Sequence, residues 1–254
     1  MQSKKNNNNY GDQSIVMLKG PDRVRKRPAV IFGSDGLEGC EHSFFEILSN
    51  AVDEAREGFG TEISIRAFND HSIEVEDHGR GVPLGWNEAE GKYNWELVYC
   101  EMYAGGKYNN NKSGASYEYS LGLNGLGACA TQYSSEYMTV ASYNGDSVSR
   151  ISFKKGFADG ELTVEPLDKK SRRTGTTIRW LPDLEVFTDI NIPREFFQET
   201  LKKQSIVNPK IRFLFDWQNA DGEFEHSEYY YENGIIDYVG ELAGGESLTA
   251  PVLW

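Results

Sequence analysis

Apolar residues along this chain recur with two spacings, and each spacing predicts a different kind of element. Over 37–57 they fall at every third or fourth position, which places them on one face of an α-helix. These residues are Leu37, Cys40, Phe44, Phe45, Leu48, Ala51, Val52 and Ala55. Gly58 and Gly60 follow at once, and glycine is common just past a helix end. The pattern therefore predicts one long helix over 37–57.

Shorter helices are marked by the same spacing or by proline in a first turn, where its missing N–H is harmless. Pro21 opens one of them and Pro28 closes it, while Pro193 opens another. The predicted segments are 21–27, 95–104, a short stretch after Gly125, 193–206 and 232–242.

Runs rich in β-branched and aromatic residues, bounded by turn residues, predict strands. They cover 62–68, 73–76, 136–143, 147–154, 161–166, 175–181, 210–217 and 224–231. Helices do not alternate regularly with these strands, so the order does not fit a Rossmann fold. It predicts an α+β fold, a two-layer sandwich of helices on a mixed, mostly antiparallel sheet.

Composition narrows the function classes. The chain has 254 residues and a net charge of −13, from 26 basic and 39 acidic side chains. A surface this acidic is poorly suited to coating nucleic acid. Three cysteines without a C-x-x-C pair favour free thiols in a reducing compartment over disulfides or a zinc site. No apolar run approaches the roughly 18 residues of a membrane span, so we expect a soluble, cytoplasmic protein with no membrane partner.

The long helix carries a polar pair in the stretch FFEILSNAVDEA. Glu46 and Asn50 are four residues apart and share one helix face. The amide oxygen of Asn50 suits a hard cation such as Mg²⁺, and Glu46 can accept a proton from water. The alternative reading is a solvated polar stripe.

A second polar stretch, EVEDHGRGVP, follows a predicted strand. Asp77 can accept a hydrogen bond from an exocyclic amine such as that of adenine. Gly79 and Gly81 allow a close backbone approach, and Arg80 can pair with Glu54 or contact a ligand. The alternative is an ordinary hairpin turn.

A long polar loop begins at GGKY (105–108) and ends at LGLNGLG (121–127). Amide groups at a glycine-rich helix start can bind an anion, and Lys107 adds a positive charge. The alternative is a flexible turn, and no Walker A sequence is present. The stretch RTGTTIRW (173–180), which includes Thr176, is by itself ordinary for a strand.

Together, in this order, the four stretches resemble the GHKL ATPases. Within that superfamily the chain looks like the ATPase domain of the B subunit of bacterial DNA gyrase or topoisomerase IV. The closest similarities are LKGPDRVRKRP, FFEILSNAVDEA, DHGRGVP, YAGGKY and YYENGIIDYV. The resemblance implies the Bergerat (GHKL) fold, with ATP and Mg²⁺ as ligands.

The resemblance also implies roles for the helix residues. Glu46 would be the general base that activates water, and Asn50 would hold Mg²⁺. His42, one turn earlier, would orient or polarise Glu46; the alternative is a helix-surface histidine. Asp77 would accept the adenine amine, supported by Thr176 directly or through water.

The resemblance also implies which other residues would surround the nucleotide. Gly79, Gly81 and Pro83 would line the adenine pocket, and Tyr117 would reach the adenine side. The phosphates would be cradled by Lys107 and by the amides of Leu123, Asn124, Gly125, Leu126 and Gly127. Most bacterial gyrases have histidine at the position of Asn124; the asparagine can still donate a hydrogen bond.

The implied organisation has three parts. Residues 1–19 would form an N-terminal arm, 20–231 the ATP-binding domain with a lid at about 105–127, and 232–254 the start of the next subdomain. In this family that subdomain supplies a lysine to the γ-phosphate. Tyr10 and Ile15 of the arm would contact a second copy of the chain when ATP binds.

The resemblance also implies binding partners, and two alternative functions stay open. The topoisomerase A subunit and DNA would bind through regions outside this chain, and inhibitors would compete for the adenine pocket. One alternative is an isolated nucleotide-binding module with little hydrolysis. Another is a different GHKL member, such as a histidine kinase, a heat-shock chaperone or MutL; RVRKRP and YAGGKY argue against these.

Overall fold

One continuous sheet dominates the computed structural model, which describes residues 14–104 and 125–244. Nine strands belong to it within those ranges: β1 (Glu62–Ala67), β2 (Ile73–Asp77), β5 (Ser135–Asn144), β6 (Ser147–Lys154), β7 (Phe157–Ala158), β8 (Thr163–Pro166), β9 (Thr174–Pro182), β10 (Arg212–Gln218) and β11 (Phe224–Tyr229). Their order is β11-β10-β1-β2-β9-β5-β6-β7, with β8 also pairing β6.

The sheet is mixed, as predicted. β1 and β10 run parallel, and the other described pairs are antiparallel. β2 therefore lies between β1 and β9, which brings the end of β2 beside the start of β9. This adjacency joins the second and fourth polar stretches of the sequence.

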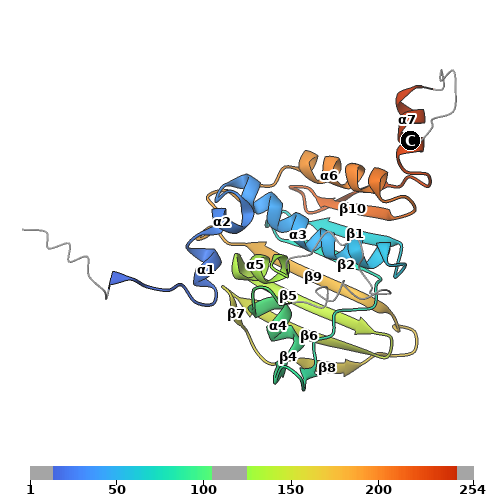
Figure 1. The fold of residues 1–254 in the computed structure, drawn as a ribbon. Coiled ribbons are helices and arrows are strands. Elements are labelled where there is room, and N and C mark those ends of the chain that lie inside the picture. Colours follow the sequence, from blue (N-terminus) through green and yellow to red (C-terminus); the bar gives the residue numbers. More distant parts are fainter. Residues whose placement is uncertain (1–13, 105–124, 245–254) are drawn as a thin grey trace, which may run out of the picture.

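Helices cover one face of the sheet (Figure 1). They are α1 (Asp22–Arg25), α2 (Pro28–Phe32), α3 (Leu37–Arg56), α4 (Asn94–Cys100), α5 (Gly127–Tyr133), α6 (Arg194–Val207) and α7 (Ile235–Leu242). Helices α3, α4, α5 and α6 lie over the sheet, α1 and α2 lie at its edge, and α7 projects beyond it at the C-terminal end (Figure 1). The predicted two-layer sandwich is confirmed.

Helix α3 supplies the centre of the core because its apolar face is unbroken. Phe44, Leu48 and Val52 have no exposed surface. Phe44 packs edge-on against Phe197 of α6, with ring centroids 4.9 Å apart. Burying side chains of this size stabilises a fold by about 1.5–3 kcal/mol each, so α3 holds a fixed position over the sheet.

Several predicted boundaries are wrong for local reasons. Pro28 does not only end the first helix: it stands at the first turn of a second helix, α2. Helix α4 stops at Cys100 rather than at residue 104, and Tyr103 adopts a left-handed backbone with φ 64°. Tyr103 N–H donates to the carbonyl of Gly125 at 3.1 Å. The hairpin of β3 (Trp86–Asn87) and β4 (Lys92–Tyr93) was not predicted.

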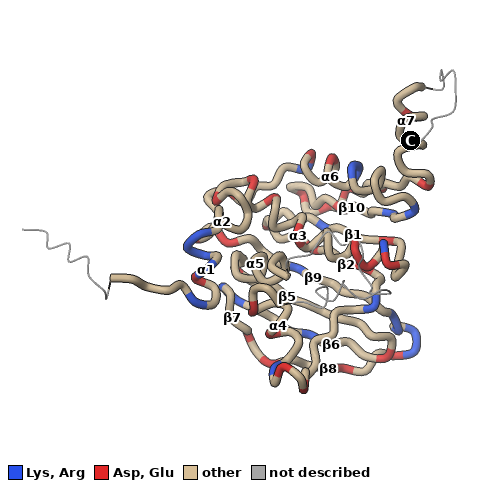
Figure 2. The backbone as a smooth tube through the Cα atoms, in the orientation of Figure 1, with Lys and Arg blue, Asp and Glu red and all other residues tan. Residues whose placement is uncertain are grey.

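Three bulk expectations can be compared with the described residues. Cys40, Cys100 and Cys129 are all free thiols, as predicted. Lysine and arginine positions alternate with aspartate and glutamate positions along much of the described backbone (Figure 2). Within 14–104 and 125–244, no helix combines the length and apolarity that a bilayer crossing requires.

Candidate functional site

A row of polar side chains runs along one side of α3. His42, Glu46, Asn50 and Glu54 follow one another at intervals of four residues, so they lie one turn apart on the same face. The opposite face of the helix enters the core. The sequence thus separates a mainly apolar side from a polar side of one helix.

His42 is held at both ring nitrogens. Its Nε2 lies 3.1 Å from Glu46 Oε1, and its Nδ1 lies 3.2 Å from the carbonyl oxygen of Phe32. Because both neighbours are acceptors, this geometry favours a proton on each ring nitrogen. The hydrogen bond to Glu46 is the largest cause that raises the pKa of His42, partly opposed by burial. The predicted pairing of His42 with Glu46 is therefore present.

Gly127, the first residue of α5, lies against Glu46. A Cβ atom at position 127 would stand 1.9 Å from Glu46 Oε2 and 2.8 Å from its Cδ. Only glycine permits this approach. The end of the glycine-rich stretch and the candidate base thus meet, although they are far apart in the sequence.

Asp77 lies at the end of β2 with one oxygen already engaged. Its Oδ1 accepts the backbone N–H of Gly79 at 2.8 Å and that of Thr176 at 3.2 Å. Thr176 therefore supports Asp77 through its amide, while its Oγ1 accepts the N–H of Val82 at 3.3 Å. Burial outweighs these hydrogen bonds and raises the pKa of Asp77 to about 6.

Glycines surround Asp77 where no side chain would fit. A Cβ on Gly79 would approach Glu54 Cβ to 2.9 Å, and one on Gly81 would approach the carbonyl of Tyr143 to 2.5 Å. Gly175 has φ 124°, and its Cβ would lie 2.0 Å from the carbonyl oxygen of Asp77. Sequence analysis missed Gly175; its place between two threonines at a strand start was the available signal.

Arg80 and Glu54 form the ion pair that the sequence predicted as one option. Arg80 Nη2 and Nε lie 2.9 and 3.0 Å from the two Glu54 carboxylate oxygens. The Arg80 guanidinium also lies 4.1 Å from the centre of the Phe59 ring. These contacts join the end of α3 to the loop that follows β2.

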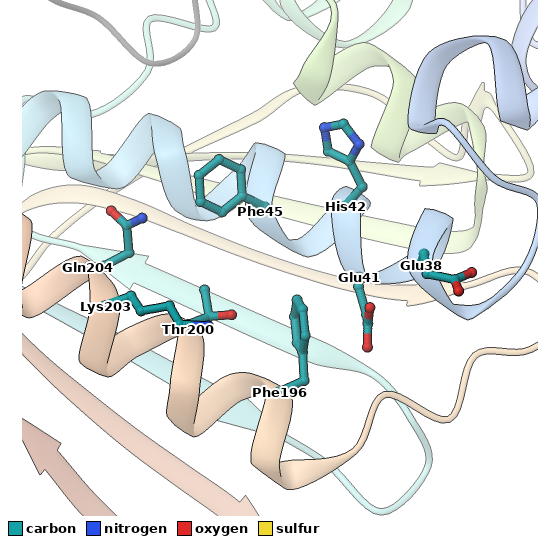
Figure 3. Close-up of a pocket in the computed structure, with 8 residues that line it drawn as sticks. All are labelled: Glu38, Glu41, His42, Phe45, Phe196, Thr200, Lys203 and Gln204. Carbon is teal, nitrogen blue, oxygen red and sulfur yellow. The ribbon is translucent and has the colours of Figure 1, made fainter.

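A separate groove of about 420 Å³ lies on the α6 side of α3 (Figure 3). Its lining residues are Glu38, Glu41, His42, Phe45, Phe196, Thr200, Lys203 and Gln204. His42 projects from α3 away from α6 and forms the margin of the groove (Figure 3). Asn50 and Asp77 do not line it, so the groove is not the predicted nucleotide site.

Other predicted residues stand as follows. Lys107, Tyr117, Leu123, Asn124 and Tyr10 lie outside the described residues, as do most of the predicted lid and arm. Gly125 and Leu126 lead directly into α5, Pro83 is exposed, and Ile15 is 77% exposed. Across 14–104 and 125–244, no group of three or more His, Cys, Asp or Glu residues could hold a metal ion.

Known proteins that are similar to this chain include two curated proteins and one solved structure. No protein-family model matches the chain. It is 34% identical over 241 residues to the B subunit of the chloroplastic/mitochondrial DNA gyrase of Oryza sativa, covering 94% of this chain and 33% of that protein. It is also 34% identical over 245 residues to the B subunit of DNA topoisomerase 4 of Staphylococcus aureus, covering 95% of this chain and 35% of that protein.

A solved structure is similar in fold as well as in sequence. The 43K ATPase domain of Thermus thermophilus gyrase B, crystallised with an aminocoumarin, superposes with a TM-score of 0.73 and 29% identity. The match covers 90% of this chain and 56% of that one. The chain thus spans about a third of the length of the curated relatives it matches.

Proposed function

The chain belongs to the family of the B subunits of DNA gyrase and topoisomerase IV, and we propose that it binds and hydrolyses ATP as the ATPase domain of a type II DNA topoisomerase. The observation that carries this proposal is the contact between Gly127 and Glu46. It puts a carboxylate that can act as base beside the backbone of a glycine-rich helix start.

In this proposal Asp77 recognises the adenine base. One of its oxygens is engaged by the amides of Gly79 and Thr176, which fixes the carboxylate plane. The carboxylate can still accept a hydrogen bond from the exocyclic amine of adenine. Gly79, Gly81 and Pro83 line the pocket in this proposal, and Tyr117 approaches the adenine from the lid.

The phosphates bind at the start of α5. Backbone amides from Leu123 to Gly127, together with Lys107, supply the donors. Asn50, one turn after Glu46 on the polar side of α3, would hold Mg²⁺ through its amide oxygen, because this ion is usually bound by one or two side-chain oxygens together with phosphate oxygens. When bound, the ion neutralises charge on the phosphates.

The chemical step is hydrolysis by in-line attack of water on the γ-phosphorus. Glu46 accepts the proton of that water. His42 holds Glu46 Oε1 and Gly127 lies against Oε2, so the carboxylate has little freedom to rotate. Fixing a base in this way lowers the entropic part of the barrier.

The proposal also covers contacts with a second copy of the chain and with other partners. The arm at 1–19, with Tyr10 and Ile15, contacts a second copy of the chain when ATP binds, and ATP-driven closure powers strand passage through DNA. The A subunit and DNA bind through regions outside 1–254, and 232–254 begins the next subdomain. The cytoplasmic location stays a prediction, since the relatives include subunits of chloroplasts and mitochondria.

A nucleotide-binding module with little turnover is the second candidate. Calorimetry with a non-hydrolysable ATP analogue and Mg²⁺ tests binding in the wild type, Asp77→Asn and Glu46→Ala. The proposal requires binding that Asp77→Asn removes and Glu46→Ala retains; equal binding by wild type and Asp77→Asn would refute the adenine assignment. A turnover assay on the same proteins then separates hydrolysis from binding alone.

A further inference from the structure

Helix α5 connects the candidate base to the N-terminal helix α1. It is seven residues long and lies between α1 and α3 (Figure 1). Its first residue, Gly127, touches Glu46. At mid-helix, Thr131 Oγ1 donates to the carbonyl of Ser43 on α3 at 3.2 Å. Because a helix of two turns moves largely as one piece, contacts at its far end take part in placing Gly127.

That far end is held by Arg25 of α1. Arg25 Nη1 donates to the carbonyl of Tyr133, the last residue of α5, at 3.1 Å. Carbonyls in the last turn of a helix have no partner within the helix, and a cation is favourable there. Arg25 thus satisfies the helix end and bears on it directly.

Arg25 is itself fixed by two carboxylates beyond the end of β9. Its Nη2 lies 2.6 Å from Asp183 Oδ2 and 3.0 Å from Glu185 Oε2. Asp183 is 3% exposed, and its N–H donates to the carbonyl of Ser134, the residue after α5. The guanidinium therefore joins α1, the end of α5 and the segment after β9 in one network.

We propose that Arg25 is a positioning residue for the ATPase chemistry: it fixes the C-terminal end of α5 and thereby the placement of Gly127 against Glu46. The effect on catalysis rests on the proposed function, whereas the effect on the position of α5 rests on the contacts described above. It also gives the segment that leads into α1 a route to the base, because any force on α1 acts on α5 through Arg25.

Arg25→Lys is the informative change. Lysine keeps the positive charge near Asp183 but lacks the planar fork that reaches a carboxylate and a carbonyl together. The protein should fold, with α5 less firmly held. Arg66→Lys is the control, since Arg66 also bridges two carboxylates, Glu74 at 2.6 Å and Asp216 at 3.4 Å. It does so from β1, which β2 and β9 separate from β5, the strand that follows α5 in the chain.

Four measurements on the whole chain test the proposal: the thermal midpoint, the His42 imidazole resonances in NMR spectra, the rate of single-turnover hydrolysis and the affinity for an ATP analogue. We assign the His42 resonances by comparison with a His42→Gln variant. We expect Arg25→Lys to shift these resonances and to slow hydrolysis by about tenfold or more, with affinity changed less than about threefold. Arg66→Lys should leave His42 unmoved at a similar loss of thermal midpoint.

Unchanged His42 resonances in Arg25→Lys would overturn the proposal and leave Arg25 a purely structural ion pair. Equal shifts in both variants would do the same, because they would reflect loosening of the whole protein. If the wild type binds no ATP analogue, the proposed function fails, yet the His42 resonances still decide whether Arg25 positions α5.

Discussion

Replacing Asp77 by asparagine should stabilise the ligand-free protein while removing its nucleotide binding. The carboxylate lies at the end of β2, where burial raises its pKa from 3.8 to about 6. At neutral pH the folded protein therefore keeps a charge in a place that disfavours it. Asparagine has nearly the same shape, and its oxygen can accept the amides of Gly79 and Thr176 that now bind Oδ1.

The size of the effect follows from the pKa of Asp77. Between pH 3.8 and about 6 the folded protein binds this proton more tightly than the unfolded chain does. The contribution of Asp77 to stability is thus greatest below pH 3.8 and is lost as the pH rises through about 6. A change of this size corresponds to about 3 kcal/mol at most. The asparagine amide must itself be buried, so we expect a gain of about 1–2 kcal/mol at pH 7.

Thermal unfolding from pH 5 to pH 8 tests this reasoning. Asp77→Asn should melt roughly 2–8 °C above the wild type at pH 7, and the difference should shrink toward pH 5. Added ATP analogue should raise the midpoint of the wild type only, because the amide N–H₂ would face the adenine amine. Asp159→Asn, at an exposed site, controls for the substitution. A lower midpoint for Asp77→Asn at pH 7, or an offset that does not change with pH, would refute the argument.

Three further predictions follow from close contacts in the site. Gly127→Ala puts a Cβ 1.9 Å from Glu46 Oε2, whereas ordinary contact begins at 3.4 Å, so one of the two groups must move by about 1.5 Å. In a hydrolysis assay this displacement should lower turnover about 100-fold. The control Gly85→Ala, whose Cβ meets nothing within 4 Å, should leave turnover unchanged. Glu46→Ala should retain analogue affinity by calorimetry and lose turnover, and retained hydrolysis would exclude Glu46 as base. Gly175→Ala, at φ 124° and 2.0 Å from the Asp77 carbonyl oxygen, should lower the free energy of unfolding in urea by about 2 kcal/mol or more.

Elements with a continuous apolar pattern could be predicted well from the sequence. The helix predicted over 37–57 is α3, which spans Leu37–Arg56. It could be predicted because one whole face of the helix enters the core, and only the helical spacing of apolar residues matches that face. The strand predicted at 147–154 matches β6 to the residue. The β3–β4 hairpin was missed because strands of two residues are too short to show the alternation that predicts a strand.

The sequence supplies the residue types of the candidate site but not its geometry. The i, i+4 spacing is enough to pair His42 with Glu46, since both lie on one helix. The contact of Gly127 with Glu46 depends on where α5 packs, which no local pattern states. The role of the Thr176 amide, rather than its hydroxyl, likewise depends on the register between β2 and β9.

The hydrogen bond from Tyr103 to Gly125 has a consequence for how chain length can vary. It joins the two residues that flank the segment 105–124 from both sides. The described part of the domain therefore does not depend on how many residues lie between them. A change in the number of residues between Tyr103 and Gly125 should therefore leave this contact between the end of α4 and the start of α5 in place. This point of the chain is thus a natural place for relatives to diverge in length and for an engineer to graft a reporter peptide.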